Sequence, residues 1–189
     1  MQSLSLKDYI KVYSTFEQDT IKSIVLELQN EDIWSRHRWT NSENISVERG
    51  GSEELYVSTG ASLEHNSLIM SSIYNLLVNY IKDVNIPEFT FWRGYSSIRF
   101  NRYKENQTMV KHFDRISSLF DGTRKGVPIL SIVGLLNDDF VGGDFIIFDD
   151  YKINLKAGDV LIFPSTFNYP HKVNPVTKGT RYSFVSWAW

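Results

Sequence analysis

Two helical patterns dominate the first half of the chain. The segment from Thr15 to Gln18 has the form of a capping box and begins an apolar pattern of helical spacing that fades by Asn30. A second and longer apolar stripe predicts a helix over residues 63–84. Between them lies a polar, glycine-containing stretch over residues 40–60, which predicts short extended pieces joined by loops.

The pattern changes in the second half, where short segments rich in β-branched and aromatic residues alternate with turn sequences. Many short strands separated by tight turns predict a sandwich or barrel. We therefore expect two helices buttressing a C-terminal β-sandwich, in a chain whose length of 189 residues suits one domain. The main predicted strands are residues 89–103, 127–136, 143–148, 160–163 and 180–189.

Composition narrows the function classes. Hydrophobic residues make up 42% of the chain, which is typical of a globular protein. The 20 basic and 22 acidic residues give no electrostatic case for a nucleic-acid partner. There is no cysteine, which fits a reducing compartment, no signal peptide is recognisable, and no apolar run reaches membrane-spanning length. We expect a soluble, cytoplasmic protein with no nucleic-acid or membrane partner.

Two of the four histidines join a carboxylate in a metal-binding pattern. His112 and Asp114 lie two residues apart in a strand-like segment, so their side chains point to the same face. His171 follows the strand predicted over residues 160–163. Two imidazoles and a carboxylate suit Fe(II) and leave adjacent positions open for a bidentate co-substrate and dioxygen. Taken alone, the H-x-D triplet also fits an accidental pair on a solvated sheet face.

Arg181 is the candidate charge partner of an acidic co-substrate. A guanidinium binds a carboxylate through two parallel hydrogen bonds, a geometry that lysine cannot match. Ser183 lies two residues along the same predicted strand and faces the same side. A buried arginine here requires an anionic partner, because an unpaired buried charge is expensive. The alternative is a surface arginine on an edge strand.

These motifs, taken in order, resemble the 2-oxoglutarate- and Fe(II)-dependent oxygenases, in their prolyl 4-hydroxylase-like branch. The segment from Tyr103 to Asp114 follows the pattern Y-x-x-G-x-x-Y-x-x-H-x-D of that branch. The intervals from Asp114 to His171 and from His171 to Arg181 match those between the carboxylate, the distal histidine and the basic residue of the branch. The glycine pair 142–143 matches a G-G turn of the branch, and residues 170–189 match its closing block. Each motif is weak singly, whereas the ordered set is specific.

The resemblance implies a fold and an activity. It implies an α+β protein with a double-stranded β-helix (jelly-roll) core over residues 89–189, supported by helices and early strands in residues 1–88, the whole forming a single domain. It also implies an oxidoreductase, a dioxygenase that converts 2-oxoglutarate to succinate and CO2 while hydroxylating a prolyl residue of a peptide or protein. Ascorbate is the implied reductant.

By the same resemblance, His112, Asp114 and His171 hold Fe(II), while Arg181, helped by Ser183 and Tyr103, holds 2-oxoglutarate. Met109 and Trp187 are the candidate substrate residues. Met109 stands where the pattern has its second tyrosine, which puts the substrate in doubt more than the chemistry. A small molecule or a free amino acid is therefore the alternative substrate.

Two other functions stay open from the sequence. Nucleic-acid dealkylases on the same scaffold carry a second arginine six residues after the first, and Trp187 occupies that place here. A non-catalytic jelly-roll binding module would leave the triad and Arg181 unexplained.

Four other features bear on the site. His37 fits a solvated turn better than a lip over the substrate, and His65 is expected on the surface. Gly50 and Gly51 belong to a loose loop or to a lid. The rings of Tyr103 and Trp187 belong equally to a core or to a pocket.

Overall fold

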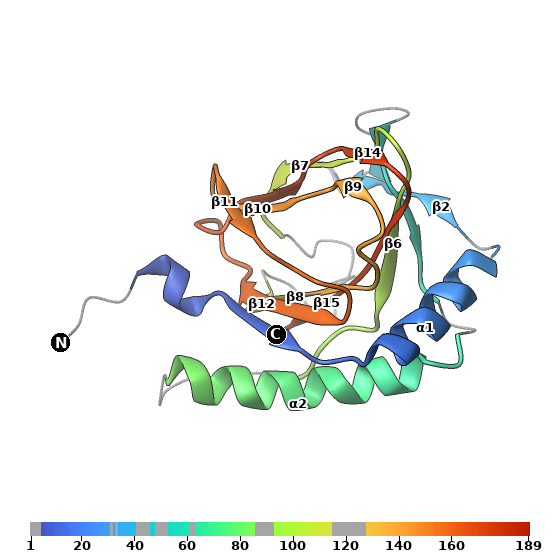
Figure 1. The fold of residues 1–189 in the computed structure, drawn as a ribbon. Helices are drawn as coiled ribbons and strands as arrows, with labels where there is room; N and C mark the ends of the chain where they lie inside the picture. Colours follow the sequence, from blue (N-terminus) through green and yellow to red (C-terminus); the bar gives the residue numbers. More distant parts are fainter. Residues whose placement is uncertain are drawn as a thin grey trace.

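The protein is built around two antiparallel sheets that face each other (Figure 1). The coordinates, a computed structural model, describe residues 5–30, 32, 34–40, 46–47, 53–60, 63–85, 93–114 and 128–189. The larger sheet has seven strands, in the order β1 (Lys11–Ser14), β12 (Asp159–Pro164), β8 (Leu130–Leu135), β15 (Arg181–Ala188), β6 (Arg99–Tyr103), β5 (Tyr56–Ser58) and β2 (Ser35–Arg36).

The smaller sheet has four strands, in the order β11 (Tyr151–Ile153), β10 (Phe145–Ile147), β13 (His171–Val173) and β7 (Met109–His112). Two short pairs complete the strands: β14 (Val176–Lys178) with β9 (Val141–Gly142), and β3 (Trp39–Thr40) with β4 (Ser46–Val47). Gly50 and Gly51, the predicted loop or lid, lie outside the described residues.

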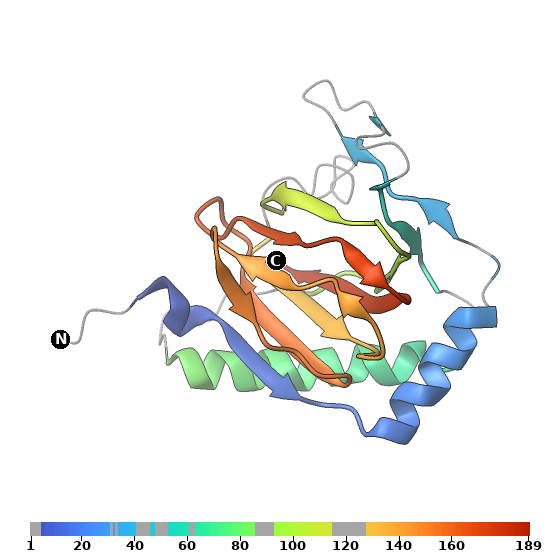
Figure 2. The same ribbon diagram turned by 45° about the horizontal axis from the view of Figure 1, so that its top comes forward.

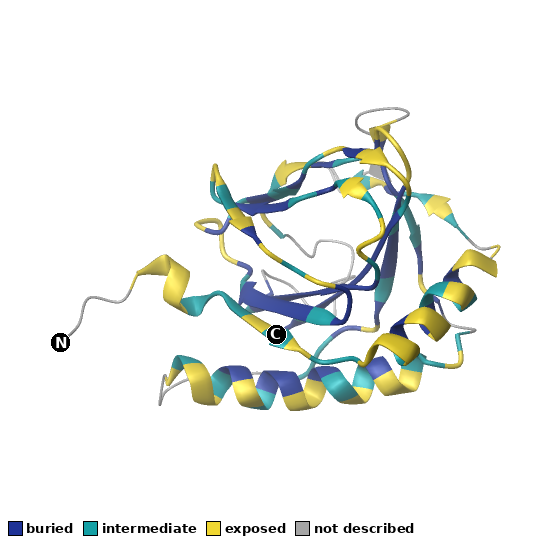
Figure 3. Ribbon diagram, in the orientation of Figure 1, coloured by how far each residue is buried: buried dark blue, intermediate teal, exposed yellow. Residues whose placement is uncertain are grey.

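Two helices cover the outer face of the large sheet. These are α1 (Gln18–Asn30) and α2 (Asn66–Val84), and a short 3-10 turn, η1 (Leu6–Tyr9), precedes β1. The buried stripe of α2 faces the sheet and its polar side faces solvent (Figure 3). This stripe packs on Phe100, Ile132 and Phe184, which lie in one apolar cluster with α1 and α2. A second apolar cluster fills the space between the two sheets.

The predicted helices are confirmed with shifted starts. Helix α1 begins at Gln18, and its first backbone hydrogen bond runs from Ile21 to the carbonyl of Glu17. Thr15 therefore does not cap the helix, and its hydroxyl donates to the carbonyl of Tyr13 instead. The backbone of Thr15 is held by the carbonyl of Gly158, a contact distant in sequence that overrides the local capping signal.

The sequence did not predict the individual strands of the N-terminal half. Strand β1 pairs with β12, with Lys11 opposite Ile162, and lies at the edge of the large sheet (Figure 2). Short strands β2 and β5 extend the other edge. In the segment predicted as one strand over residues 89–103, only Arg99–Tyr103 among the described residues forms an element. No helix in the described part of the chain is long and apolar enough to cross a membrane, and the cytoplasmic location stays a prediction.

Alternation along the two central strands assigns side chains to opposite faces. On β6, Phe100 packs under the helices, whereas Tyr103 points between the sheets. On β15, Phe184 packs under the helices, whereas Arg181 and Ser183 line the space between the sheets. The inner face of the large sheet therefore carries polar groups at its centre.

Candidate active site

One cavity between the sheets collects the residues singled out from the sequence. It has an empty volume of about 420 Å³. All eight candidate residues line it: Tyr103, Met109, His112, Asp114, His171, Arg181, Ser183 and Trp187. Tyr103 and Trp187 both line the cavity, and Tyr103 also belongs to the apolar cluster between the sheets, against which Trp187 packs. The two rings therefore serve the core and the pocket at once.

Strand pairing brings the two histidines together. His112 at the end of β7 is the register partner of His171 at the start of β13, and their ring centroids lie 4.3 Å apart. Asp114 lies two residues beyond His112, and its Oδ1 is 3.5 Å from His112 Nε2 and 3.8 Å from His171 Nε2. One ligand atom from each residue lies within 4.8 Å of the others.

The hydrogen bonds of the triad direct its lone pairs inward. The Nδ1 atoms of both histidines lie against backbone carbonyls, 2.8 Å from that of Val110 for His112 and 3.1 Å from that of Tyr169 for His171. With Nδ1–H donating to these carbonyls, each Nε2 keeps its lone pair for the centre of the triad. Asp114 Oδ2 accepts from the Ser131 hydroxyl, which is bonded in turn to Ser165. The other oxygen of Asp114, Oδ1, therefore faces the two imidazoles.

The electrostatics of the triad suit a cation. Burial alone would raise the pKa of Asp114, but His171, His112 and the Ser131 hydroxyl together hold it well below its usual range. Burial lowers the pKa of His171 to about 4, against the opposing effect of Asp114, so this imidazole is neutral at pH 7. A carboxylate with neutral imidazoles is a donor set for Fe(II), so these residues fit the iron that the motifs imply.

Arg181 is a buried cation that faces no carboxylate in the part of the chain that the structure describes. Its side chain is 1% exposed, and its Nη1 donates to Ser183 Oγ at 2.8 Å. The guanidinium lies 5.1 Å from the ring centroid of Tyr103, and its Nε has no hydrogen-bond partner. Within the described residues no carboxylate lies within salt-bridge distance of it. Burial lowers the pKa of Arg181, with Tyr103 acting in the opposite direction. A carboxylate ligand would supply the missing partner.

The glycine pair predicted as a turn has a steric role beside Arg181. Gly143 adopts a φ of +63°, and a Cβ atom at this position would come within 3.0 Å of Arg181 Cδ. Any larger residue would therefore crowd the arginine side chain where it enters the cavity.

The N-terminal strands add a polar cluster beside the triad. His37 is buried, with its Nδ1 3.5 Å from Glu54 Oε2. Trp39 donates from Nε1 to Glu54 Oε1 at 2.9 Å, and its ring lies 5.2 Å from that of His112. The expectation of a solvated turn at His37 is wrong, because the pairing of β2 with β5 carries this segment against the cavity.

Some expectations for single residues change as well. His65 is half-buried, and its Nδ1 contacts Glu27 of α1, so it joins the two helices and is not a free surface residue. Besides Ser131 on β8, the sequence reasoning missed two polar residues of the cavity wall, Arg99 and Asn101. Both lie an even number of residues before Tyr103 on β6, so strand alternation directs their side chains to the same face. This position could have been predicted from the sequence.

Comparison with known proteins finds a family and several relatives that the chain resembles. The family model of the 2OG-Fe(II) oxygenase superfamily matches residues 98–189. A PKHD-type hydroxylase of Idiomarina loihiensis is 28% identical over 189 residues, covering 94% of this chain and 76% of the relative. A PKHD-type hydroxylase of Acinetobacter baumannii is 37% identical over 94 residues, which are 47% of this chain and 40% of that relative. The chain is therefore similar to the 2OG-Fe(II) oxygenases, most clearly over residues 98–189.

Solved structures confirm the predicted α+β jelly-roll fold. A prolyl-4-hydroxylase of Pseudomonas putida aligns with a TM-score of 0.71 at 17% identity, over 94% of this chain and 91% of that one. A prolyl hydroxylase of Trichoplax adhaerens, in complex with a hypoxia inducible factor oxygen degradation domain peptide fragment, gives a TM-score of 0.69 at 16% identity. That alignment covers 96% of this chain and 84% of the other. The fold is prolyl 4-hydroxylase-like.

Proposed function

We propose that this protein hydroxylates its substrate with Fe(II) as cofactor and 2-oxoglutarate as co-substrate, consuming dioxygen and releasing succinate and CO2. In this proposal His112, Asp114 and His171 hold the iron. Arg181 binds the far carboxylate of 2-oxoglutarate, with Ser183 and Tyr103 beside it. The observation that carries the proposal is the presence in one cavity of a convergent His–Asp–His triad and a buried arginine that is paired with no carboxylate of the described residues.

The residues of the chain have distinct tasks in this reaction. Bound iron supplies the oxidative chemistry, while the protein positions the reactants and excludes water. The Ser131 hydroxyl fixes one oxygen of Asp114, and the backbone carbonyls of Val110 and Tyr169 fix the tautomers of the two imidazoles. Phe145 stacks on the His171 ring with centroids 5.5 Å apart, which shields this side of the triad from solvent.

For the substrate we propose a prolyl residue of a peptide or protein. The names of the solved prolyl hydroxylases, one of them bound to a peptide, support this choice. Met109 and Trp187 line the cavity and offer an apolar and an aromatic surface for a pyrrolidine ring. A free amino acid or another small molecule is the alternative, and ascorbate is part of the proposal as reductant.

The test is incubation of the protein with Fe(II), 2-oxoglutarate, ascorbate and a library of proline-containing peptides. We expect succinate to form and at least one peptide to gain one oxygen by mass spectrometry, both abolished in His171→Ala. Succinate that forms with a small metabolite, and with none of the peptides, would overturn the prolyl assignment alone. Absence of succinate under every condition would overturn the oxygenase proposal.

A further inference from the structure

A second arginine lines the same cavity and has no part in the proposed function so far. Arg99 lies on β6, four residues before Tyr103 and two before Asn101, so all three side chains face the cavity. Its register partner on β15 is Val185.

The guanidinium of Arg99 is held in one orientation. Its Nε donates to Asn101 Oδ1 at 3.2 Å, and its carbon Cζ lies 5.1 Å from the ring centroid of Trp187. A guanidinium fixed at Nε and stacked on a ring presents its two terminal nitrogens as a pre-organised fork. Such a fork matches the two oxygens of a carboxylate.

The fork has no anion of its own. Among the described residues no carboxylate oxygen lies within salt-bridge distance of Arg99, and Asn101 provides its side-chain hydrogen bond. Burial lowers the pKa of Arg99, while Tyr103 and Asp114 oppose this shift. Asp114 therefore acts on Arg99 at longer range, and its own oxygens are directed to Ser131 and the imidazoles.

Arg99 and Arg181 lie too far apart to bind one small dianion together. Arg181 is the register partner of Tyr103, so the two arginine backbones are separated by four residues along the sheet, or about 13 Å. Their side chains also diverge, since Arg181 lies over Tyr103 and Arg99 lies over Trp187, at the opposite end of β15. A five-carbon diacid extends about 5 Å between its terminal carbons. The two guanidiniums are therefore placed to bind separate carboxylates.

This inference rests on the proposed function. If that function is accepted, a count of the charges in the cavity also indicates that Arg99 binds an anion. Fe(II) and the 2-oxoglutarate dianion cancel, and Asp114 offsets one of the two arginines. Among the charged residues that line the cavity, one positive charge is left over, at Arg99, where unpaired charge is costly. We infer that Arg99 binds a carboxylate of the substrate, so that the substrate class is an acid: a prolyl peptide with a nearby carboxylate, or a small organic acid.

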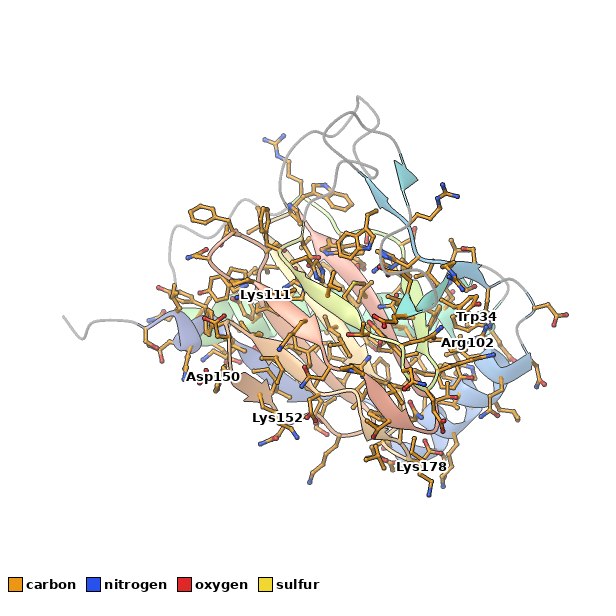
Figure 4. The ribbon with its side chains drawn as sticks, turned by 90° about the horizontal axis from the view of Figure 1, so that it is seen from above. Trp34, Arg102, Lys111, Asp150, Lys152 and Lys178 are labelled. Carbon is orange, nitrogen blue, oxygen red and sulfur yellow. The ribbon has the colours of Figure 1, made fainter. Side chains whose placement is uncertain are left out.

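The test uses binding to the loaded protein and a matched control arginine. Arg102 lies on the same strand but on the opposite face, over Trp34 with a distance of 4.4 Å from Cζ to the ring centroid (Figure 4). The variants are Arg99→Met, Arg99→Lys and Arg102→Met, each loaded with Mn(II) and saturating 2-oxoglutarate. The probes are matched pairs: proline and prolinamide, succinate monoamide and succinamide, and acetyl-Ala-Pro-Asp-amide with acetyl-Ala-Pro-Asn-amide. Paramagnetic relaxation of the probe protons reports binding near the metal.

We expect at least one carboxylate to bind about ten- to a hundred-fold more tightly than its amide, the range of a charge-assisted hydrogen bond. Arg99→Met should abolish this preference, Arg99→Lys should keep part of it, and Arg102→Met should leave it unchanged. The probe pair that shows the preference for carboxylate over amide identifies the substrate as a peptide or as a small acid. Equal binding of every carboxylate and amide, or no binding of any carboxylate, would overturn the inference, as would a preference that survives Arg99→Met. Failure of the unmodified protein to bind Mn(II) and 2-oxoglutarate would instead count against the proposed function.

Discussion

Replacing Arg181 with methionine should weaken co-substrate binding without weakening the fold. Methionine keeps an apolar stem similar to that of arginine but removes the guanidinium. In the ligand-free protein this removes one hydrogen bond to Ser183 and one contact with the Tyr103 ring, together about 1.5 to 3 kcal/mol. It also removes a buried cation that has no anionic partner, whose desolvation costs several kcal/mol. The two effects oppose each other, so we expect the ligand-free variant to unfold with about the same free energy or a slightly larger one.

Binding of 2-oxoglutarate should respond quite differently. Loss of one partner of a buried charge pair costs about 2 kcal/mol or more, which raises the dissociation constant at least about 30-fold. A ligand at a hundred times its dissociation constant stabilises the unmodified protein by about 2.7 kcal/mol. At the same concentration the variant should gain only about 0.9 kcal/mol or less.

Urea unfolding, followed by tryptophan fluorescence with Mn(II) present, measures both quantities in one experiment with and without 2-oxoglutarate. Arg102→Met on the outer face is the matched control and should keep the full stabilisation by 2-oxoglutarate. A ligand-free Arg181→Met that loses about 3 kcal/mol or more, as a broken structural ion pair would, and still keeps the full stabilisation by 2-oxoglutarate would refute the reasoning.

Three further predictions concern the metal, the core and the pH dependence. His171→Ala should abolish stoichiometric Fe(II) binding in equilibrium dialysis, since two remaining ligands hold a labile ion poorly; undiminished affinity would remove His171 from the site. Gly134→Ala should destabilise the protein by about 1 to 3 kcal/mol, because its Cβ would lie 2.0 Å from Phe184 Cε1. In the double variant, Phe184→Leu should recover part of this loss. Free energies of unfolding that are simply additive in the double variant would contradict this reason. Burial, with Arg99 and His112 adding to it, lowers the pKa of His37 to about 3 in the folded state, against about 6.5 when unfolded. Only the unfolded chain then binds this proton between those values, so the unmodified protein should lose about 1.4 kcal/mol more stability than His37→Gln between pH 7.5 and 5.5. Equal losses in the two proteins would exclude this role for His37.

The sequence was informative where a local pattern also determines the contact. Arg181 and Ser183 share a face because they lie two residues apart on β15. Asp114 lies two residues after His112, just beyond the end of β7, and its carboxylate is still directed to both imidazoles. Asn106 stands where the pattern of the branch has its glycine, and its φ of 66° lies in the left-handed region that asparagine tolerates. In each case the neighbours along the chain are also the neighbours in space.

The sequence was less informative where contacts come from strand pairing across the chain. The position of His37 depends on pairing of β2 with β5 and of β5 with β6, which no local pattern specifies. Strand β1 exists through its pairing with β12, which lies near the other end of the chain. Arg99 is an intermediate case. The face on which its side chain lies can be predicted by counting back from Tyr103, but its stacking on Trp187 depends on the register between β6 and β15.

The position of β15 at the centre of the large sheet has a consequence for folding. Without it, the strands on its two sides would form separate ribbons, β1-β12-β8 and β6-β5-β2, each with an open edge. Phe184 of β15 pairs with Phe100, which is distant in sequence, so closure of the sheet depends on contacts that form slowly. Until β15 is synthesised and inserted, β8 and β6 expose unpaired edges that can join other chains. We therefore expect a nascent chain lacking residues 181–188 to be aggregation-prone and to depend on chaperones, not to be a partly active enzyme.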